Sequence, residues 1–292
     1  MLLKNDDLLI LSAGSLTFKF LPSGDLFQAL YGSTMINQWL SNSIDGSLNN
    51  IYLRVHDESG IQAYPLIGVH SQSRVRKLAN RLVYEGEASG IRYEVVFTPT
   101  EQGIWFWDVR LTGNHQQVDL IYGQDIGIAD TGAVRSNEAY LSQYIDHTVF
   151  EDENKGYVVC SRQNQPQRGA FSYVQQGSLT QAVSYATDGF QFYGLSYKET
   201  NIPECLTREN LANEVYQYEF AYTALQTERI QLAGETNFAF YGIFKADHPA
   251  AITTLEYNAE IEQAYEAVRA IELREGEFME QVSRMPSIGA PL

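Results

Sequence analysis

The sequence predicts a mainly β protein, a large antiparallel β-sandwich that ends in an α-helix. Aromatic residues make up 12% of the 292 residues and charged residues 19%, with 19 Tyr and 14 Phe against 4 Met. This balance is typical of sheets and not of helical bundles. Short runs of alternating apolar and polar residues recur between Gly-containing turns, and a chain of this length holds one large β domain or two smaller ones.

The first half of the chain alternates most clearly. A loop containing Gly86 and Gly90 is expected to join two of its strands. In segment 104–111, two Trp, Val and Leu share one face while Ile104 and Phe106 occupy the other, so we expect this strand to be buried on both sides. Strands are predicted at residues 16–20, 51–55, 81–85, 91–98 and 104–111.

Strand-like alternation continues to about residue 245. No internal sequence repeat accompanies it. Regularly spaced short strands with hardly any helical periodicity favour an antiparallel sandwich with many strands. Further strands are predicted at residues 117–122, 157–161, 190–197, 216–225, 229–232 and 237–245.

A change of period near residue 247 predicts two regions, a β-sandwich domain over residues 1–246 and a helical linker with a tail over 247–292. Asp247 is the expected helix cap and Pro249 the first-turn residue. The apolar stripe of this helix is expected either to lie on the sandwich or to stay exposed as a docking face, in which case the chain would form homodimers or aggregate. The stripe consists of Tyr257, Ile261, Ala264, Val268 and Ile271, and a second short apolar piece holds Phe278 and Val282.

The charge and the N-terminus exclude several classes of protein. A net charge of −16 and a pI near 4.7 argue against binding to nucleic acid or to an anionic membrane, because both require clusters of Lys and Arg. The apolar run at residues 8–11 is too short for a signal peptide or a spanning helix, which predicts a cytoplasmic protein.

Metal and nucleophile signals are weak. Cys160 and Cys205 lie far apart and form no zinc motif, so two buried thiols are expected. The acidic segment 151–154 lacks the ligand spacing of a calcium loop and is interpreted as a solvated turn. Ser178 is not in a G-x-S-x-G motif. Trp105 and Trp107 share a strand face with aliphatic residues, which favours core packing over a sugar platform.

A polar stretch at residues 122–167 interrupts the alternation and is the predicted functional site. Forked donors beside carboxylates suit the paired hydroxyls of a sugar. An internal hydrogen-bond network that braces an inter-domain face is an equally strong interpretation, because buried polar groups tend to pair with each other. A role for His147 as a general base has little support, since no nucleophile is evident near it. The candidate substrate-binding residues are Arg135, Asn137, Glu138, Tyr144, Asp146, His147, Arg162, Gln163 and Asn164.

The sequence resembles the N-terminal part of the glycoside phosphorylases of glycoside hydrolase family 94, and within it the 1,2-β-oligoglucan phosphorylase branch. The segments that carry the resemblance occur in order from about residue 15 to about residue 285. They are NIYLR (50–54), YGQDIGIAD (122–130), RSNEAYLSQYIDH (135–147), CSRQNQPQ (160–167), QQGSLT (175–180), TDGFQFYGLSYK (187–198) and EFAYTALQTE (219–228).

The resemblance implies a β-supersandwich similar to galactose mutarotases, followed in the family by a helical linker, an (α/α)6 barrel and a small sheet domain. In that family the catalytic Asp and the phosphate ligands lie on the barrel, so no catalytic residue is expected in this chain. The implied reaction is reversible transfer between a β-1,2-linked gluco-oligosaccharide and α-glucose 1-phosphate, with inorganic phosphate as co-substrate and no metal or organic cofactor. The implied partners are the glucan and a barrel domain, in cis or in trans.

Three alternative functions, from different classes, remain open for the chain. The first is the substrate-binding and assembly domain of a phosphorylase, inactive until a barrel completes it. The second is a stand-alone carbohydrate-binding module. The third is a mutarotase-like sugar enzyme, which rests on fold analogy alone.

Overall fold

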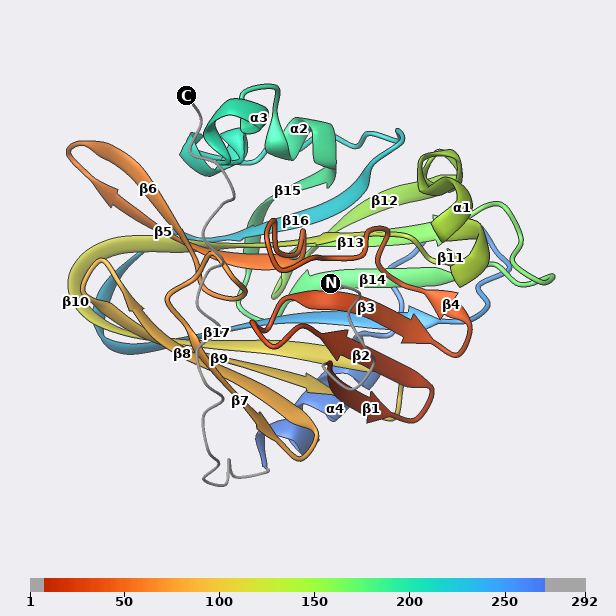
Figure 1. The fold of residues 1–292 in the computed structure, drawn as a ribbon, viewed down its shortest axis with the longest axis horizontal. Coiled ribbons are helices and arrows are strands. Elements are labelled where there is room, and N and C mark those ends of the chain that lie inside the picture. Colours follow the sequence, from red (N-terminus) through yellow and green to blue (C-terminus); the bar gives the residue numbers. More distant parts are fainter. Residues whose placement is uncertain (1–7, 271–292) are drawn as a thin grey trace.

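The structure, a computed structural model, describes residues 8–270 and consists of two largely antiparallel sheets that face each other (Figure 1). The smaller sheet has five strands in the order β1-β2-β3-β4-β11, and the larger sheet has twelve. The predicted mainly β sandwich, followed by a helix, is confirmed.

The elements have the following bounds. The small sheet contains β1 (Leu9–Ala13), β2 (Leu16–Phe20), β3 (Leu26–Tyr31), β4 (Thr34–Met35) and β11 (Ala129–Asp130). The large sheet contains β5 (Asn50–Asp57), β6 (Gly60–Pro65), β7 (Arg74–Leu78), β8 (Arg81–Ala88), β9 (Ile91–Pro99), β10 (Ile104–Asp125), β12 (Ile145–Asp152), β13 (Gly156–Gln163), β14 (Tyr173–Ser178), β15 (Ala182–Asp188), β16 (Ala221–Thr227) and β17 (Ile230–Lys245). The helices are α1 (Thr131–Ser142), α2 (Gly189–Tyr193), α3 (Tyr197–Thr200), the 3-10 helix η2 (Glu204–Thr207) and α4 (Asn258–Arg269).

The long strand β10 organises the large sheet. Its first half pairs with β9 and β17, and its second half pairs with β5 and β16. Strand β16 pairs directly with β10 and is also linked to it through β15, β13, β14 and β17. These strands therefore form a closed ring. A bulge between Asn114 and Gln117 bends β10 where its partners change. The two strands predicted at 104–111 and 117–122 are therefore one.

The main core lies between the sheets and is rich in aromatic rings. Phe18 of the small sheet contacts Phe97 and Trp105 of the large sheet, with ring centroids 4.7 and 5.5 Å apart. Trp105 and Trp107 are buried in this core, and the prediction that they pack there is confirmed. Cys160 and Cys205 are both buried and free, as predicted.

Helix α4 lies on the outer face of the large sheet. Ile261, Ala264 and Val268 recur at helical spacing and pack on Ile104 and Phe106, which confirms that this strand is buried on both sides. The alternative in which the stripe stays exposed is wrong for the described residues. The predicted stripe residue Ile271, and the piece at Phe278 and Val282, lie outside the described residues.

The predicted start of this helix at Asp247 is wrong, because the helix begins at Asn258. Asp247 instead accepts a hydrogen bond from the Phe171 amide at 2.9 Å. The carbonyls of His248 and Pro249 accept hydrogen bonds from Arg162 at 2.7 and 2.9 Å, which hold this segment against β13. The predicted domain boundary at residues 246 and 247 stays a prediction.

The strand predicted at 190–197 is also wrong, because these residues form α2 and the start of α3. Asp188 caps α2 by accepting from the Gln191 amide at 2.9 Å, and Gly194 ends it with a φ of 71°. The three short helices α2, α3 and η2 cover the outer face of β5 and β16 (Figure 1). Phe192 and Tyr193 form the buried face of α2, whereas Phe190 is exposed.

Other boundaries differ from the predictions in smaller ways. Residues 216–220 precede β16 as an irregular segment, and the strands predicted at 229–232 and 237–245 are the single strand β17. Gly86 lies inside β8, where the Tyr93 ring covers it, and not in the turn. The helix α1 was not predicted. Within residues 8–270, no helix has the length and apolar character needed to cross a membrane.

Candidate functional site

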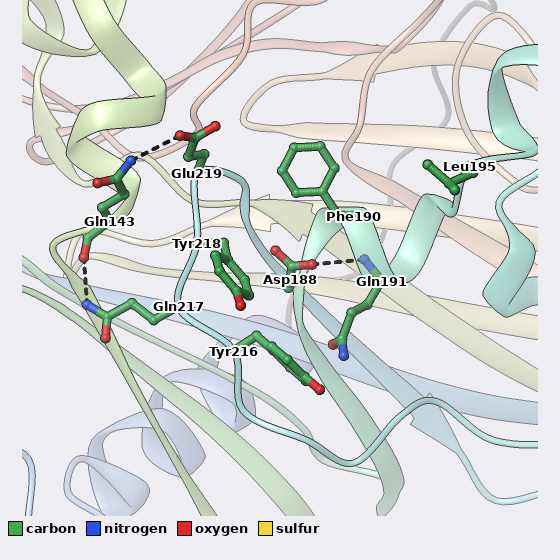
Figure 2. Close-up of a pocket in the computed structure, with 9 residues that line it drawn as sticks. All are labelled: Gln143, Asp188, Phe190, Gln191, Leu195, Tyr216, Gln217, Tyr218 and Glu219. Carbon is green, nitrogen blue, oxygen red and sulfur yellow. Dashed lines mark hydrogen bonds between the residues drawn. The ribbon is translucent and has the colours of Figure 1, made fainter.

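A cleft of about 930 Å³ opens beside α2 and is lined by aromatic, amide and carboxylate side chains (Figure 2). One wall comes from Asp188, Phe190 and Gln191 at the start of α2, with Leu195 beyond the helix. The other wall is segment 216–219, which leads into β16. These two walls lie side by side because β15 and β16 are paired neighbours in the closed sheet.

Short hydrogen bonds fix the irregular wall of the cleft. The Tyr216 amide donates to Thr187 Oγ1 at 2.8 Å, which ties the segment to the end of β15. Gln217 Nε2 donates to the Gln143 carbonyl at 2.7 Å, and Gln143 Nε2 donates to Glu219 Oε1 at 3.2 Å. The end of α1 therefore closes this side of the cleft, as Figure 2 shows.

Aromatic rings are unusually exposed here. Phe190 is 62% exposed and Tyr218 57%, although exposing large apolar side chains brings no stability. Tyr216 stacks on Tyr218 with centroids 6.0 Å apart, and Phe190 meets Phe220 edge to face at 5.8 Å. These contacts hold the rings in place while leaving surface open to a ligand.

Asp188 is the most unusual polar group of the cleft. The residue is 2% exposed, and its Oδ2 accepts from the Gln191 amide. Its Oδ1 is buried and has no hydrogen-bond partner among the described residues. Burial raises the pKa of the Asp188 carboxyl above its usual value. An unpaired acceptor of this kind is costly unless a ligand donor reaches it.

The arrangement is suited to binding. Exposed rings accept the flat face of a ligand, and the carboxylates and amides accept or donate hydrogen bonds at its edge. No group of three His, Cys, Asp or Glu side chains positioned for a metal ion occurs in residues 8–270.

The sequence-predicted residues lie beside the cleft, along α1 and its following strands. Tyr144 packs edge to face on Tyr140, and the two hydroxyls are 3.1 Å apart. Asn137 interrupts α1 with a non-helical backbone, and its Oδ1 accepts from the Tyr140 amide at 3.1 Å. Within residues 8–270, the five members of this group form no hydrogen bonds with one another. They are the exposed Arg135, Asn137, Tyr144 and Asp146 and the half-buried Glu138.

His147 is held in the sheet. Its Nδ1 lies 2.8 Å from Ser161 Oγ, and its Nε2 is buried without a hydrogen-bond partner in the described part of the chain. Burial lowers the pKa of His147 to about 4, so the ring is neutral at physiological pH.

Arg162 is buried and uses its donors within the fold. It donates to the carbonyls of His248 and Pro249 and to the Asn164 side chain. Its guanidinium also lies 4.3 Å above the Phe171 ring. These contacts support the interpretation that Arg162 and Asn164 brace the segment before α4, while their contact with sugar stays a prediction.

Gln163 has a similar place. It is fully buried, its Nε2 donates to the Leu141 carbonyl at 3.2 Å, and its Oε1 accepts from the Gln165 amide at 3.0 Å. Its side chain therefore ties the end of α1 to β13.

Only Gln143 joins the predicted stretch 122–167 to the cleft. Sequence reasoning missed the cleft residues on α2 and before β16 because both segments were interpreted as strands. Two signals were present: the capping pair of Asp188 and Gly194, and a Tyr-rich run next to acidic residues. Both segments also overlap the stretches TDGFQFYGLSYK and EFAYTALQTE that resemble the phosphorylases.

Comparisons with known proteins agree with a carbohydrate-related sandwich domain. The family model described as the SOGP N-terminal domain matches residues 19–242. The 1,2-beta-oligoglucan phosphorylase of Listeria innocua is 42% identical over 236 residues, which are 81% of this chain and 21% of the relative. The chain belongs to the SOGP N-terminal domain family. It spans about a fifth of the length of the curated relative that it matches.

Two solved structures are more distant. A GalM/aldose epimerase homologue from C. elegans has a TM-score of 0.46 and 9% identity, covering 82% of this chain and 99% of the other. Galactose 1-epimerase from Lactobacillus acidophilus has a TM-score of 0.43 and 10% identity, covering 85% and 97%. At these scores neither likeness carries an argument about activity.

Proposed function

We propose that the chain is the N-terminal domain of a glycoside phosphorylase that converts β-1,2-gluco-oligosaccharides and inorganic phosphate to α-glucose 1-phosphate with inversion. The 42% identity to the Listeria 1,2-beta-oligoglucan phosphorylase over 81% of the chain carries this proposal. Membership of glycoside hydrolase family 94 belongs to the same proposal.

The division of labour follows from the chemistry. Phosphate is already anionic, so a phosphorylase needs one acid and a set of phosphate ligands, where an inverting glycosidase needs a second carboxylate to activate water. We place the acid and the phosphate ligands on an (α/α)6 barrel that acts in cis or in trans. This chain contributes to substrate binding and assembly, with the exposed Arg135, Asn137, Tyr144 and Asp146 as candidate contacts.

Assembly and location remain part of the proposal. Because the apolar residues of α4 between 258 and 269 pack on the sheet, the argument for a homodimer through an exposed helix is removed, and the homodimer itself stays a prediction. A cytoplasmic location likewise stays a prediction. The acidic chain favours neutral ligands over nucleic acid or anionic membranes.

A second candidate function is a stand-alone carbohydrate-binding module. The observation that favours it is the cleft, whose exposed rings and polar rim belong entirely to this chain. The mutarotase-like alternative has no comparable support, because Nε2 of His147 is buried.

A chimaeric enzyme tests the proposal. In it, the matched region of the Listeria enzyme is replaced by this chain, and α-glucose 1-phosphate release from β-1,2-glucan in phosphate buffer is measured. We expect the chimaera to be active, and the Listeria enzyme without its matched region to lose about 100-fold or more in kcat/KM, since mispositioned substrate has that cost. The 292-residue chain alone should release none. Phosphorolysis by that chain alone would place the acid among its own carboxylates and contradict the proposal.

A further inference from the structure

We propose that the cleft between α2 and segment 216–219 is a binding site for a neutral β-linked gluco-oligosaccharide, with a glucose ring on the Tyr218 and Phe190 rings and a sugar hydroxyl donating to Asp188 Oδ1. The location of the site rests on geometry, and the choice of glucan rests on the proposed function. The site is separate from the polar residues on α1 that the sequence singles out.

The unpaired acceptor identifies the type of group that binds. Asp188 Oδ1 is buried in the cleft wall without a hydrogen-bond partner in the described residues. The other carboxylate oxygen, Oδ2, already accepts from the Gln191 amide. In Figure 2 the carboxylate points into the space between Phe190 and Tyr218. Because Oδ1 is covered in this structure, a ligand O–H or N–H must displace the side chains around it to pair with it, and the pair then removes the cost of a buried unpaired acceptor.

The charge of the cleft excludes anionic ligands. Its lining includes the carboxylates of Asp188 and Glu219 and no Lys, Arg or His. The whole chain carries a net charge of −16, which repels phosphate and sugar phosphates further. The ligand that fits is therefore neutral, rich in hydroxyl donors, and distinct from inorganic phosphate or glucose 1-phosphate.

The aromatic rings add the apolar half of a sugar site. Pyranose rings present a face of C–H groups, and exposed aromatic faces bind such surfaces while their edges stay wet. Tyr218 stacked on Tyr216 offers a rigid platform, and Phe190 stands across the cleft from it. The cleft volume of about 930 Å³ lies within the roughly 300–1,000 Å³ common for small-molecule sites, enough for more than one sugar ring.

Amide side chains complete the rim. Gln191 Oε1 is buried and unpaired in the described structure, and in Figure 2 its amide points toward Tyr216, on the other side from the Asp188 carboxylate. Gln217 uses its Nε2 on the Gln143 carbonyl, which fixes the orientation of its amide. Several acceptors at fixed positions recognise hydroxyls at fixed positions, as in a stereochemically defined sugar.

Direct binding measurements test the inference. Isothermal titration of the 292-residue chain with β-1,2-gluco-oligosaccharides is expected to show binding in the micromolar to millimolar range. Tyr218→Ala should weaken it roughly tenfold or more by removing the platform. Asp188→Asn should weaken it to a similar degree, because the amide keeps the cap with its oxygen and turns an N–H2 toward the sugar.

Matched controls separate the cleft from the rest of the surface. Tyr140→Ala removes an exposed ring outside the cleft, and Arg168→Ala removes an exposed charge that belongs neither to the cleft nor to the sequence-predicted residues. Both variants should bind the glucan as the parent does. Circular dichroism confirms folding of each variant, and Tyr218→Ala, an exposed position, keeps the test valid if Asp188→Asn unfolds.

Any of the following results would overturn the inference. The first is no binding of β-1,2-gluco-oligosaccharide up to about 10 mM, the weak end of specific affinity. The second is equal binding by the cleft variants, or glucose 1-phosphate binding as tightly as the glucan. The third is that the cleft variants weaken docking of the truncated Listeria enzyme and leave sugar affinity unchanged, which would make the cleft a domain interface. An active chimaera beside any of these results leaves the proposed function intact.

Discussion

Two buried carboxylates of this protein have opposite surroundings. Asp119 is fully buried, and its oxygens accept from Arg54 at 2.6 and 2.7 Å and contact His56 Nε2 at 2.7 Å. Asp188 is 2% exposed, yet one of its oxygens has no partner in the described residues. The two carboxylates are equally buried and differ in whether both of their oxygens have hydrogen-bond partners.

The Arg54 cluster is a brace between strands and a loop. Beyond the bidentate pair with Asp119, the guanidinium donates to the carbonyls of Arg208 and Glu209, which follow η2. All of these partners lie within the protein, so the charges are compensated without a ligand. Paired and fully hydrogen-bonded charges of this kind tolerate burial, while a single remaining charge does not.

Arg54→Ala should have the largest effect on stability. It leaves the buried Asp119 carboxylate with His56 as its remaining side-chain partner and frees two loop carbonyls, so we expect a loss of about 3–5 kcal/mol in the free energy of unfolding. Urea denaturation followed by fluorescence measures it. The control Arg168→Ala breaks an ion pair in which Arg168 is 73% exposed, and should cost less than about 1 kcal/mol. Equal losses in the two variants would show that the buried cluster is not a brace.

Gly242→Ala tests how tightly the core of the sandwich is packed, in contrast to the open cleft. A Cβ at Gly242 would lie 2.1 Å from the Trp105 ring, which is buried and cannot move away. Overpacking of this kind costs about 1–3 kcal/mol. Gly132→Ala, in the exposed first turn of α1, is the matched control and should change stability by less than about 1 kcal/mol. Thermal unfolding compares the two, and an unchanged midpoint for Gly242→Ala would mean that this part of the core yields easily.

His147 gives a pH-dependent version of the comparison, because its buried nitrogen is unpaired like Asp188 Oδ1. Its pKa is lowered from 6.5 to about 4 in the folded protein. Between these values the unfolded chain binds a proton that the folded chain does not, so stability falls as pH falls. The loss relative to His147→Gln should approach about 1.4 kcal/mol per pH unit. Denaturation at pH 7 and pH 4.5 measures it, and parallel losses in both proteins would contradict the assignment.

The sheet-forming half of this structure was predictable because its signal is local. Trp105 and Phe106 alternate in sequence and point to opposite faces, and each face is covered as expected. The C-terminal helix was predictable from the spacing of Ile261, Ala264 and Val268, but its start was not. Asp247 has the right chemistry for a cap, yet it bonds to Phe171, 76 residues away.

The cleft was less predictable because its walls depend on pairing distant in the chain. Phe190 and Phe192 alternate as in a strand, and the cap at Asp188 outweighs that pattern only because Phe192 packs on Tyr52 and Tyr222. Of the polar stretch 122–167, Gln143 alone is among the residues that line the cleft. The composition of this stretch could not show that the side chains of Arg162 and Gln163 form their hydrogen bonds within the fold.

Asp188→Asn should have the smallest effect on stability and the opposite sign to Arg54→Ala. The raised pKa of Asp188 means that burial disfavours its ionised form. An Asn keeps the cap of α2 and carries no charge, so the variant should equal or exceed the parent by up to about 1 kcal/mol at pH 7. A carboxyl whose pKa is raised on folding stabilises the fold below its unfolded pKa of 3.8, and this contribution is lost as pH rises through the folded pKa. The difference in the free energy of unfolding between Asp188→Asn and the parent should therefore vanish near pH 3. Urea denaturation at the two pH values measures this. A clear loss of stability at pH 7 would mean that the Asp188 carboxylate, like that of Asp119, holds the fold together.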